Sequence, residues 1–304
     1  MLNTSIRPPD LKPGDRIGIL APARKVSKEE MIPAITILKQ WGYEVLEAKH
    51  LYGSSDQYSG TDEERIADLQ TMLDDSSIKA IFCARGGYGS VRLIDHIDLT
   101  HFRKHPKWII GYSDATVFHS HILRHTGIQT LHAAMPINFP LDLKDNESLK
   151  SIRLVLEGGN PEYHFPSHPL NRKGEAGAQL IGGNLSILYS LSGTASDIDT
   201  NGKILFLEDL DEYLYHIDRM MINLKRSGKL QGLAGLLLGG MNDMNDNKVL
   251  FGKSAYEIIA EAVSVYNFPV IFDFKSGHIS ENLGLIIGGQ LNLKADESCS
   301  LVFE

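Results

Sequence analysis

The sequence of 304 residues lacks most of the signals that mark secreted and membrane-spanning proteins. Its two cysteines, Cys83 and Cys299, do not have the spacing of a zinc site, and we expect both to be reduced and buried. The most apolar stretches, such as Leu233–Met241, fall far short of the ~20 residues that a membrane helix needs. Residues 1–14 contain charges and three prolines but no apolar core, so they do not look like a signal peptide. These absences predict a cytoplasmic protein with no membrane partner.

An excess of positive charge is also missing from the chain. It has 30 Lys and Arg residues against 38 Asp and Glu, so its net charge of −8 gives no electrostatic reason to expect a nucleic-acid partner. Hydrophobic residues make up 42% and charged residues 22%, which is the usage of a folded globular chain and not of a disordered one. At roughly 100–200 residues per domain, the length predicts about two domains.

Short β-branched runs alternate with helical patterns through the first half. Two segments, Lys28–Trp41 and Asp62–Asp74, have apolar residues at helical spacing, and each opens with a capping box. The strand candidates between and after them are Arg16–Ala21, Glu44–Ala48, Ile78–Ala84, Trp108–Gly111 and Gln129–His132. Repeated strand–helix–strand units imply right-handed crossovers and a mainly parallel α/β sheet. Ligands of such sheets bind at the carboxyl ends of the strands.

A change of composition separates the two halves. Residues 158–175 contain three prolines and few periodic apolar positions, so we expect a linker between a first domain, 1–157, and a second domain, 176–304. The second half is less regular, and its topology is only weakly constrained. Its expected strands are Lys203–Leu207, Gly235–Gly239, Val270–Phe274 and Gly284–Gly288, with helices near Tyr213–Arg226 and Ser254–Val265.

The segment Ile109–Ala115 has the layout of a nucleophile elbow. An apolar strand ends at Gly111, and Ser113 follows two residues later, directly before a predicted helix over Asp114–His125. The usual second glycine is replaced by Ala115, which is small enough to be tolerated. On this segment alone, Ser113 as a nucleophile and Ser113 as a helix N-cap are both open.

A glycine-rich turn, Ala84–Gly89, follows the strand that contains Cys83. Glycines at such a turn let backbone N–H groups approach a ligand closely, which fits an oxyanion hole or an anion cradle in which Arg85 binds a carboxylate. The alternative is a tight turn with Arg85 in solvent. A dinucleotide fingerprint is incomplete here, and the first strand-to-helix turn has no glycine.

Two further candidates lie at strand ends in the second half. Glu208 ends an apolar strand and is suited to orient a base, whereas the neighbouring Asp209, Asp211 and Glu212 fit a helix start, where the macrodipole favours acidic residues. His278 follows another strand and stands beside a glycine. Together, Ser113, Glu208 and His278 have the chain order of one class of catalytic triad.

Three other histidines, His119, His121 and His125, lie on the predicted elbow helix. His121 and His125 are four residues apart, but the glutamate of H-E-x-x-H is absent. We therefore expect ordinary core or surface histidines and no metal site.

Six segments in order resemble the LD-carboxypeptidase (muramoyltetrapeptide carboxypeptidase) family of serine peptidases, over nearly the whole chain. The matching segments are Gly14–Pro22, Ala84–Gly89, Gly111–Asp114, Gly182–Leu185, Leu207–Asp209 with Tyr215–Arg219, and Ser276–His278. One small departure is Ala23, where many members have serine. The resemblance implies a Rossmann-like N-terminal domain and a smaller, β-rich swivelling β/β/α domain, with the site in the cleft between them.

The resemblance also implies roles for particular residues. Ser113 would be the nucleophile, His278 the base and Glu208 its orienting carboxylate, with the backbone N–H groups of Gly87 and Asp114 as the oxyanion hole. The expected substrate-binding residues are Arg85, Gly86 and Asn184. The family forms homodimers, needs no cofactor or metal, and cuts the terminal D-alanine from muramyl tetrapeptides, small peptides of cell-wall recycling.

Three alternatives stay open. The microcin C immunity hydrolases use the same triad on aminoacyl- or peptidyl-nucleotide analogues and need an aromatic shelf, for which Tyr163, His164 and Phe165 are the candidates. A non-catalytic muramyl-peptide sensor would use the same cleft with a misaligned triad. A nucleotide-binding Rossmann protein is disfavoured by the missing glycine fingerprint.

Overall fold

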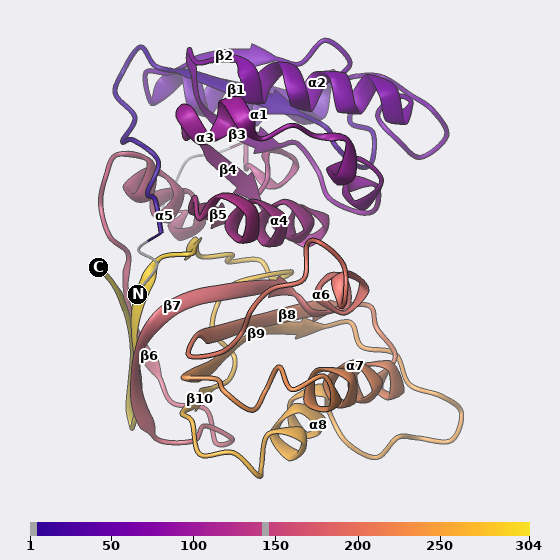
Figure 1. Cartoon of the computed structure of the whole chain (residues 1–304), viewed down its shortest axis with the longest axis vertical. Helices are drawn as coiled ribbons and strands as arrows, with labels where there is room; N and C mark the ends of the chain where they lie inside the picture. Colours follow the sequence, from indigo (N-terminus) through magenta and orange to yellow (C-terminus); the bar gives the residue numbers. More distant parts are fainter. Residues whose placement is uncertain (1–4, 142–145) are drawn as a thin grey trace.

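The computed structural model describes residues 5–141 and 146–304, and these fold into two sheets with flanking helices (Figure 1). The first sheet has the strand order β11-β5-β4-β3-β1-β2. Its strands are β1 (Arg16–Leu20), β2 (Glu44–Glu47), β3 (Ile78–Cys83), β4 (Trp108–Gly111), β5 (Thr130–His132) and β11 (Leu285–Ile287). Strands β1 to β5 are parallel, as the alternating pattern predicts.

Helices cover this sheet and connect its strands. They are α1 (Lys28–Gln40), α2 (Asp62–Asp74), α3 (Thr100–Lys104), α4 (Thr116–Thr126) and α5 (Glu147–Leu156), with short 3₁₀ helices η1 (Ser90–Arg92), η2 (Ile94–His96), η3 (Ser113–Ala115) and η4 (Pro136–Asn138). Both predicted capping boxes form, Ser27 with Glu30 and Thr61 with Glu64. In the order β2-β1-β3-β4-β5, the chain proceeds from β1 to β2 on one side and then continues from β3 on the other side. The position between β1 and β3 is therefore the topological switch point, where ligands of doubly wound sheets bind.

The second sheet has the strand order β10-β9-β8-β7-β12-β13-β6. Its strands are β6 (Glu162–Pro166), β7 (Gly174–Asn184), β8 (Ile204–Leu210), β9 (Gly235–Asn242), β10 (Val270–Ile271), β12 (Gln290–Ala295) and β13 (Ser298–Phe303). Its helices are α6 (Leu185–Leu191), α7 (Leu214–Arg226) and α8 (Ala255–Ala262). Strands β7 to β10 are parallel, and β12, β13 and β6 are antiparallel. The two sheets confirm an α/β fold with a parallel-rich first domain and a β-rich second domain.

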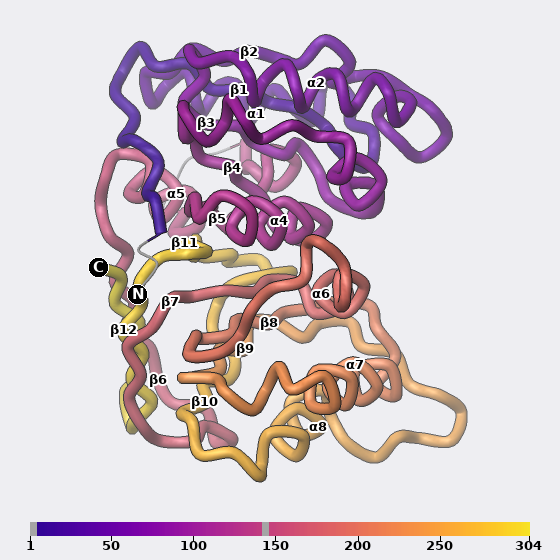
Figure 2. Tube along the Cα trace, viewed as in Figure 1, coloured from indigo at the N-terminus to yellow at the C-terminus, as the bar shows by residue number. Residues whose placement is uncertain are grey.

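The second half of the chain returns to the first sheet. Strand β11, expected with the second domain, pairs antiparallel with β5, where Ile286 lies opposite Leu131. Figure 2 shows β11 in yellow alongside β5, and α4 facing β7 and α6 across the junction of the two domains. Residues 272–284 therefore cross from the second sheet to the first. This crossing carries His278 to the carboxyl edge of the first sheet.

The sequence expectation for the two cysteines is confirmed. Cys83 and Cys299 are both buried and free. Burial raises the pKa of the Cys83 thiol, which keeps it protonated. Within residues 5–141 and 146–304, no helix combines the length and apolar character needed to cross a membrane.

Candidate active site

Ser113 lies in a tight turn between β4 and η3. Its backbone φ is +61°, a left-handed conformation that is strained for a residue with a side chain. The turn is tight because Gly111 lacks a side chain: a Cβ there would lie 2.9 Å from the Cβ of Ala115 and 3.1 Å from that of Cys83. His119 also contacts the turn, because its Nε2 lies 2.9 Å from the carbonyl oxygen of Gly111. This is the geometry of a nucleophile elbow.

The Ser113 hydroxyl does not cap a helix. Tyr112 is the N-cap of η3 and Ala115 that of α4, and neither end has a side-chain cap. The N-cap alternative therefore does not account for Ser113. Its hydroxyl is left available for chemistry.

The glycine turn after β3 lies against this elbow. A Cβ on Gly86 would come within 3.0 Å of the Ser113 Oγ, so only glycine lets the turn approach so closely. Gly87 has φ +108°, and its backbone N–H has no acceptor within the part of the chain that the structure describes. The buried Asp114 carboxylate accepts a hydrogen bond from the Ser90 N–H at 2.8 Å. Asp114 thus ties the glycine turn to the elbow, and burial raises the pKa of its carboxyl.

Glu208 and His278 form a buried pair in the second domain. Glu208 is fully buried at an irregularity of the β8–β9 ladder, between Leu207 and Asp209, and such bulges redirect a side chain. Its Oε2 accepts hydrogen bonds from His278 Nδ1 at 2.7 Å and from the His278 backbone N–H at 3.2 Å. Burial alone would lower the pKa of His278, but the hydrogen bond and the charge of Glu208 raise it. Nδ1 therefore carries a proton, and Nε2 is the nitrogen free to accept one.

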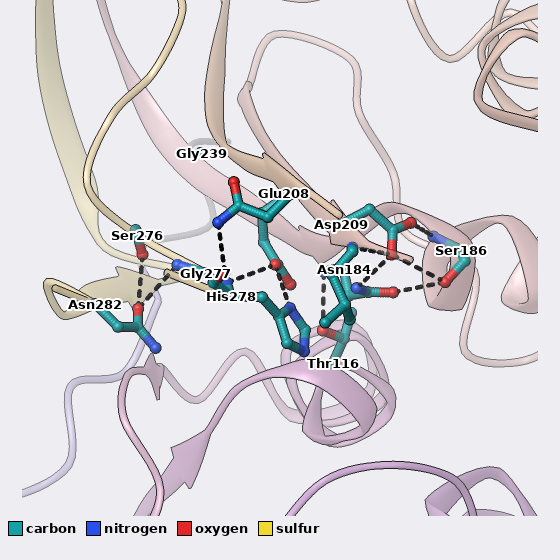
Figure 3. A network of polar contacts seen from close by, with 12 residues as sticks. Thr116, Asn184, Ser186, Glu208, Asp209, Gly239, Ser276, Gly277, His278 and Asn282 are labelled. Carbon is teal, nitrogen blue, oxygen red and sulfur yellow. Dashed lines mark hydrogen bonds and ion pairs between the residues drawn. The ribbon is translucent and has the colours of Figure 1, made fainter. Parts of the chain in front are cut away.

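The loop around His278 is fixed by its neighbours (Figure 3). Gly277 has φ +106°, and a Cβ there would lie 2.6 Å from Glu208 Oε2. Asn282 Oδ1 accepts the Gly277 N–H at 2.9 Å and the Ser276 hydroxyl at 3.3 Å. Asn282 was not predicted from the sequence, because no local pattern distinguishes it from other loop asparagines.

The two halves of the site come together at Tyr112. The His278 ring lies with its centroid 4.7 Å from that of Tyr112, the residue before Ser113. Among the described residues, no hydrogen bond joins the Ser113 hydroxyl to His278. In free enzymes such catalytic hydrogen bonds are often long and tighten when substrate binds.

A second polar network lies beside the pair and joins the domains. The Asn184 backbone N–H donates to Thr116 Oγ1 of α4 at 3.0 Å, and the Asn184 side chain donates to Asp209 at 2.9 Å while capping α6 (Figure 3). Asp209 also accepts the Ser186 N–H at 2.8 Å. Burial, followed by the charge of Glu208, raises the pKa of Asp209 to about 7. Asn184, expected to bind substrate, has its side-chain amide engaged by protein groups.

The expectation for Asp209 needs correction. It does not sit at the start of α7: it is buried in β8, which runs on to Leu210. Its carboxylate serves the first turn of α6 instead. Asp211 and Glu212 do precede α7, and Glu212 contacts His216 at 2.6 Å.

The remaining candidates are placed as follows. The Arg85 side chain is 38% exposed and lies 3.8 Å from Glu30. His119 and His121 are buried and His125 contacts a backbone carbonyl, and the described residues contain no cluster suited to a metal ion. Tyr163 and Phe165 pack on Phe274. With His164 they line a separate cavity of about 610 Å³.

Comparisons with known proteins agree along the whole chain. A family model described as the LD-carboxypeptidase N-terminal domain matches residues 17–133, and one described as the LD-carboxypeptidase C-terminal domain matches residues 177–293. The chain is 34% identical to a probable murein peptide carboxypeptidase of Bacillus subtilis, over 99% of this chain and 96% of that protein. It is similar to the crystal structure of muramoyltetrapeptide carboxypeptidase from Oxalobacter formigenes, with a TM-score of 0.85, 27% identity and coverage of 95% and 98%. The microcin C7 self-immunity protein MccF has the same fold, with a TM-score of 0.86, 22% identity and coverage of 99% and 98%.

Proposed function

The chain belongs to the LD-carboxypeptidase family, and we propose that it is a serine-type carboxypeptidase that releases the terminal D-alanine from muramyl tetrapeptides. The observation that carries the proposal is the buried Glu208–His278 pair, held against Tyr112 beside a strained Ser113. A serine at an elbow is a weak nucleophile until a base removes its proton, and a histidine oriented by a carboxylate is such a base.

The proposed first half-reaction is acylation. Ser113 Oγ attacks the carbonyl carbon of the bond before D-alanine while His278 Nε2 takes the hydroxyl proton. The tetrahedral oxyanion is held by the N–H groups of Gly87 and Asp114. His278 then gives its proton to the D-alanine nitrogen as the C–N bond breaks, which leaves a tripeptidyl ester on Ser113.

The second half-reaction is hydrolysis of that ester. A water molecule attacks the ester carbonyl and gives a proton to His278. As the ester bond breaks, this proton returns to Ser113 Oγ and the tripeptide acid is released. Glu208 fixes the tautomer of His278 and stabilises its cation.

We also propose a small closure of the two domains during catalysis. Ser113 lies on the first domain, whereas Glu208 and His278 come from the second, so a change at their junction alters the distance from nucleophile to base. Thr116 and Asn184 link the domains next to this junction. The homodimer and the cytoplasmic role in cell-wall recycling belong to the same proposal, and light scattering tests the dimer.

Mass spectrometry tests the proposed reaction. Purified protein is incubated with L-Ala-γ-D-Glu-meso-diaminopimelyl-D-Ala, together with Ser113→Ala and, as a matched control, the exposed Ser76→Ala. Loss of one D-alanine with the wild type and Ser76→Ala, but not with Ser113→Ala, is the expected result. Cleavage by Ser113→Ala would contradict the assigned nucleophile.

Absence of cleavage by every variant would favour the nucleotide-peptide hydrolase alternative. A peptidyl adenylate analogue is then the next substrate. The cavity beside Tyr163, His164 and Phe165 would be its expected adenine site, because these side chains line it.

A further inference from the structure

A small cavity lies beside the proposed catalytic residues, at the junction of the two domains. It has a volume of about 160 Å³ and is bounded by Tyr112, which precedes Ser113, and by Ile279, which follows His278. The first domain also contributes Ala134 and Leu149, and the second contributes Asn282. None of its described lining residues carries a charged side chain. The space suits one small amino acid and excludes a tripeptide.

Asn282 supplies an unused hydrogen-bond donor in the wall of this cavity. Only 4% of the residue is exposed, and its Nδ2 has no partner among the described residues. The orientation of the amide is fixed because its other end, Oδ1, accepts the Gly277 N–H at 2.9 Å. Figure 3 shows the nitrogen pointing away from Ser276 and Gly277. A buried donor without a partner destabilises the protein, and a bound acceptor removes that cost.

The N-terminus of α5 forms another wall of the same cavity. This ten-residue helix is capped by the Asn146 side chain, and Asn146, Ser148 and Leu149 all line the cavity. The Ser148 hydroxyl accepts the Asn282 backbone N–H at 2.8 Å, so Asn282 is fixed directly at the helix end. Free N–H groups and the macrodipole at a helix N-terminus favour an anion.

We infer that this cavity binds the C-terminal residue of the peptide substrate, with its carboxylate at the α5 N-terminus and Asn282 Nδ2. The inference rests on the proposed function, because the leaving amine must lie beside His278 to receive its proton. The residue attached to that amine is then next to Ile279 and Tyr112, where the cavity begins. The methyl group of D-alanine packs against Ala134 and Leu149, and a larger side chain does not fit.

This assignment differs from the sequence-based expectation for Arg85. The Arg85 side chain does not line the cavity, is partly exposed, and has Glu30 nearby. Asn282 and the N-terminus of α5 instead offer neutral donors in a buried site, where a hydrogen bond to a charged group is stronger than one to a neutral group. The cavity should therefore bind a peptide with a free C-terminal carboxylate more tightly than the same peptide with a C-terminal amide.

The test compares two ligands on the catalytically inactive full-length protein. Calorimetric titration of Ser113→Ala measures the affinity for the tetrapeptide acid and for the same peptide ending in D-alaninamide. We expect the acid to bind about tenfold or more tightly than the amide. Adding Asn282→Asp keeps an oxygen for the Gly277 N–H but brings a negative charge into the cavity. It should abolish the preference for the acid while changing amide binding little.

Controls separate this site from other causes. Asn247→Asp adds the same charge on an exposed loop and should leave the preference intact. Saturation-transfer NMR of the wild type with D-alanine and D-alaninamide makes the same comparison without any substitution. This NMR comparison tests the inference even where Asn282→Asp does not fold. Equal affinity for acid and amide, or loss of the preference in Arg85→Ala but not in Asn282→Asp, would overturn the inference.

The two proposals fail in different ways. A wild type that releases D-alanine but binds acid and amide equally retains its proposed function and loses this site. A protein that prefers the acid through Asn282 but never releases D-alanine retains the site and loses the proposed function. Failure of Ser113→Ala to bind either peptide, with no NMR transfer to D-alanine, would overturn the site.

Discussion

One oxygen of Glu208 accepts two hydrogen bonds from the same residue, from His278 Nδ1 at 2.7 Å and from the His278 backbone N–H at 3.2 Å. The ring and the main chain of His278 are thus fixed by a single carboxylate. The arrangement requires glycine at position 277, because a Cβ there would lie 2.6 Å from that oxygen. The orientation of the His278 ring and the conformation of the loop are therefore coupled.

Replacing Glu208 by glutamine tests this coupling. Glu208→Gln keeps the shape of the side chain but removes the charge and permits the wrong tautomer of His278. We expect kcat for D-alanine release to fall on the order of 10³–10⁴-fold. The acid limb of kcat/KM should also move to lower pH, since Glu208 raises the pKa of His278 and the base is active only when neutral. An unchanged acid limb would contradict the assigned pair.

Two substitutions at Ser113 separate the effect of backbone strain on stability from the role of the hydroxyl in the reaction. Ser113→Ala keeps a Cβ at φ +61°, whereas Ser113→Gly removes it. Both should lose at least ~10⁴-fold in kcat while binding tetrapeptide. The glycine variant should be more stable than the alanine variant by about 1 kcal/mol, because left-handed conformations cost L-residues roughly 1–2 kcal/mol. Urea midpoints measure the difference, and equal midpoints would show that the elbow is not strained.

Gly86 tests the close approach of the glycine turn. A Cβ from Gly86→Ala would lie 2.9 Å from Ser113 Cβ, so either the turn or the serine must move. We expect kcat to fall at least tenfold, since misplacing a reacting group by ~1 Å costs about 10²-fold. Gly235→Ala is the matched control, because its Cβ would meet neighbours only at 3.4–3.7 Å. Activity lost equally in both variants would argue against a specific role for the turn.

Local patterns were sufficient to predict the five parallel strands of the first sheet. The capping boxes at Ser27 and Thr61 and the apolar runs between them depend on neighbours in sequence, and the structure places both helices within one residue of the prediction. The sheet to which β11 belongs is decided by its pairing with β5, which is far away in the sequence. Its apolar run predicts a strand over Gly284–Gly288 but not which sheet accepts it, and the sequence alone places this strand in the second domain.

Composition misled in two other places. Residues Glu162–Pro166 of the expected linker form edge strand β6, a position in a sheet that tolerates proline. The acidic run after Leu207 also does not show that Asp209 faces inward. The bulge at Glu208 that shifts the register arises from the pairing of β8 with β9, which the local sequence does not specify. Asn282 and Ser148, at the N-terminal end of α5, are 134 residues apart in the sequence and meet only in the fold.

Asp209 makes stability depend on pH in a direction opposite to that of most carboxylates. Burial and the charge of Glu208 raise its pKa from 3.8 to about 7. Between these values the native state holds a proton that the unfolded state has lost. The contribution of Asp209 to stability is thus fully present below 3.8 and is lost as pH rises through about 7.

Asp209→Asn should remove this pH dependence. We expect the free energy of unfolding of the wild type to fall more between pH ~5 and ~8 than that of the variant, by on the order of 2 kcal/mol. The single amide oxygen of asparagine cannot accept from both Asn184 and Ser186 as the two carboxylate oxygens do, but this loss is nearly constant with pH and leaves the slope interpretable. Urea unfolding across the pH range measures both slopes, with the exposed Asp243→Asn as control. Parallel slopes for wild type and Asp209→Asn would mean that Asp209 stays ionised throughout, and its hydrogen bonds to Asn184 and Ser186 would then outweigh burial.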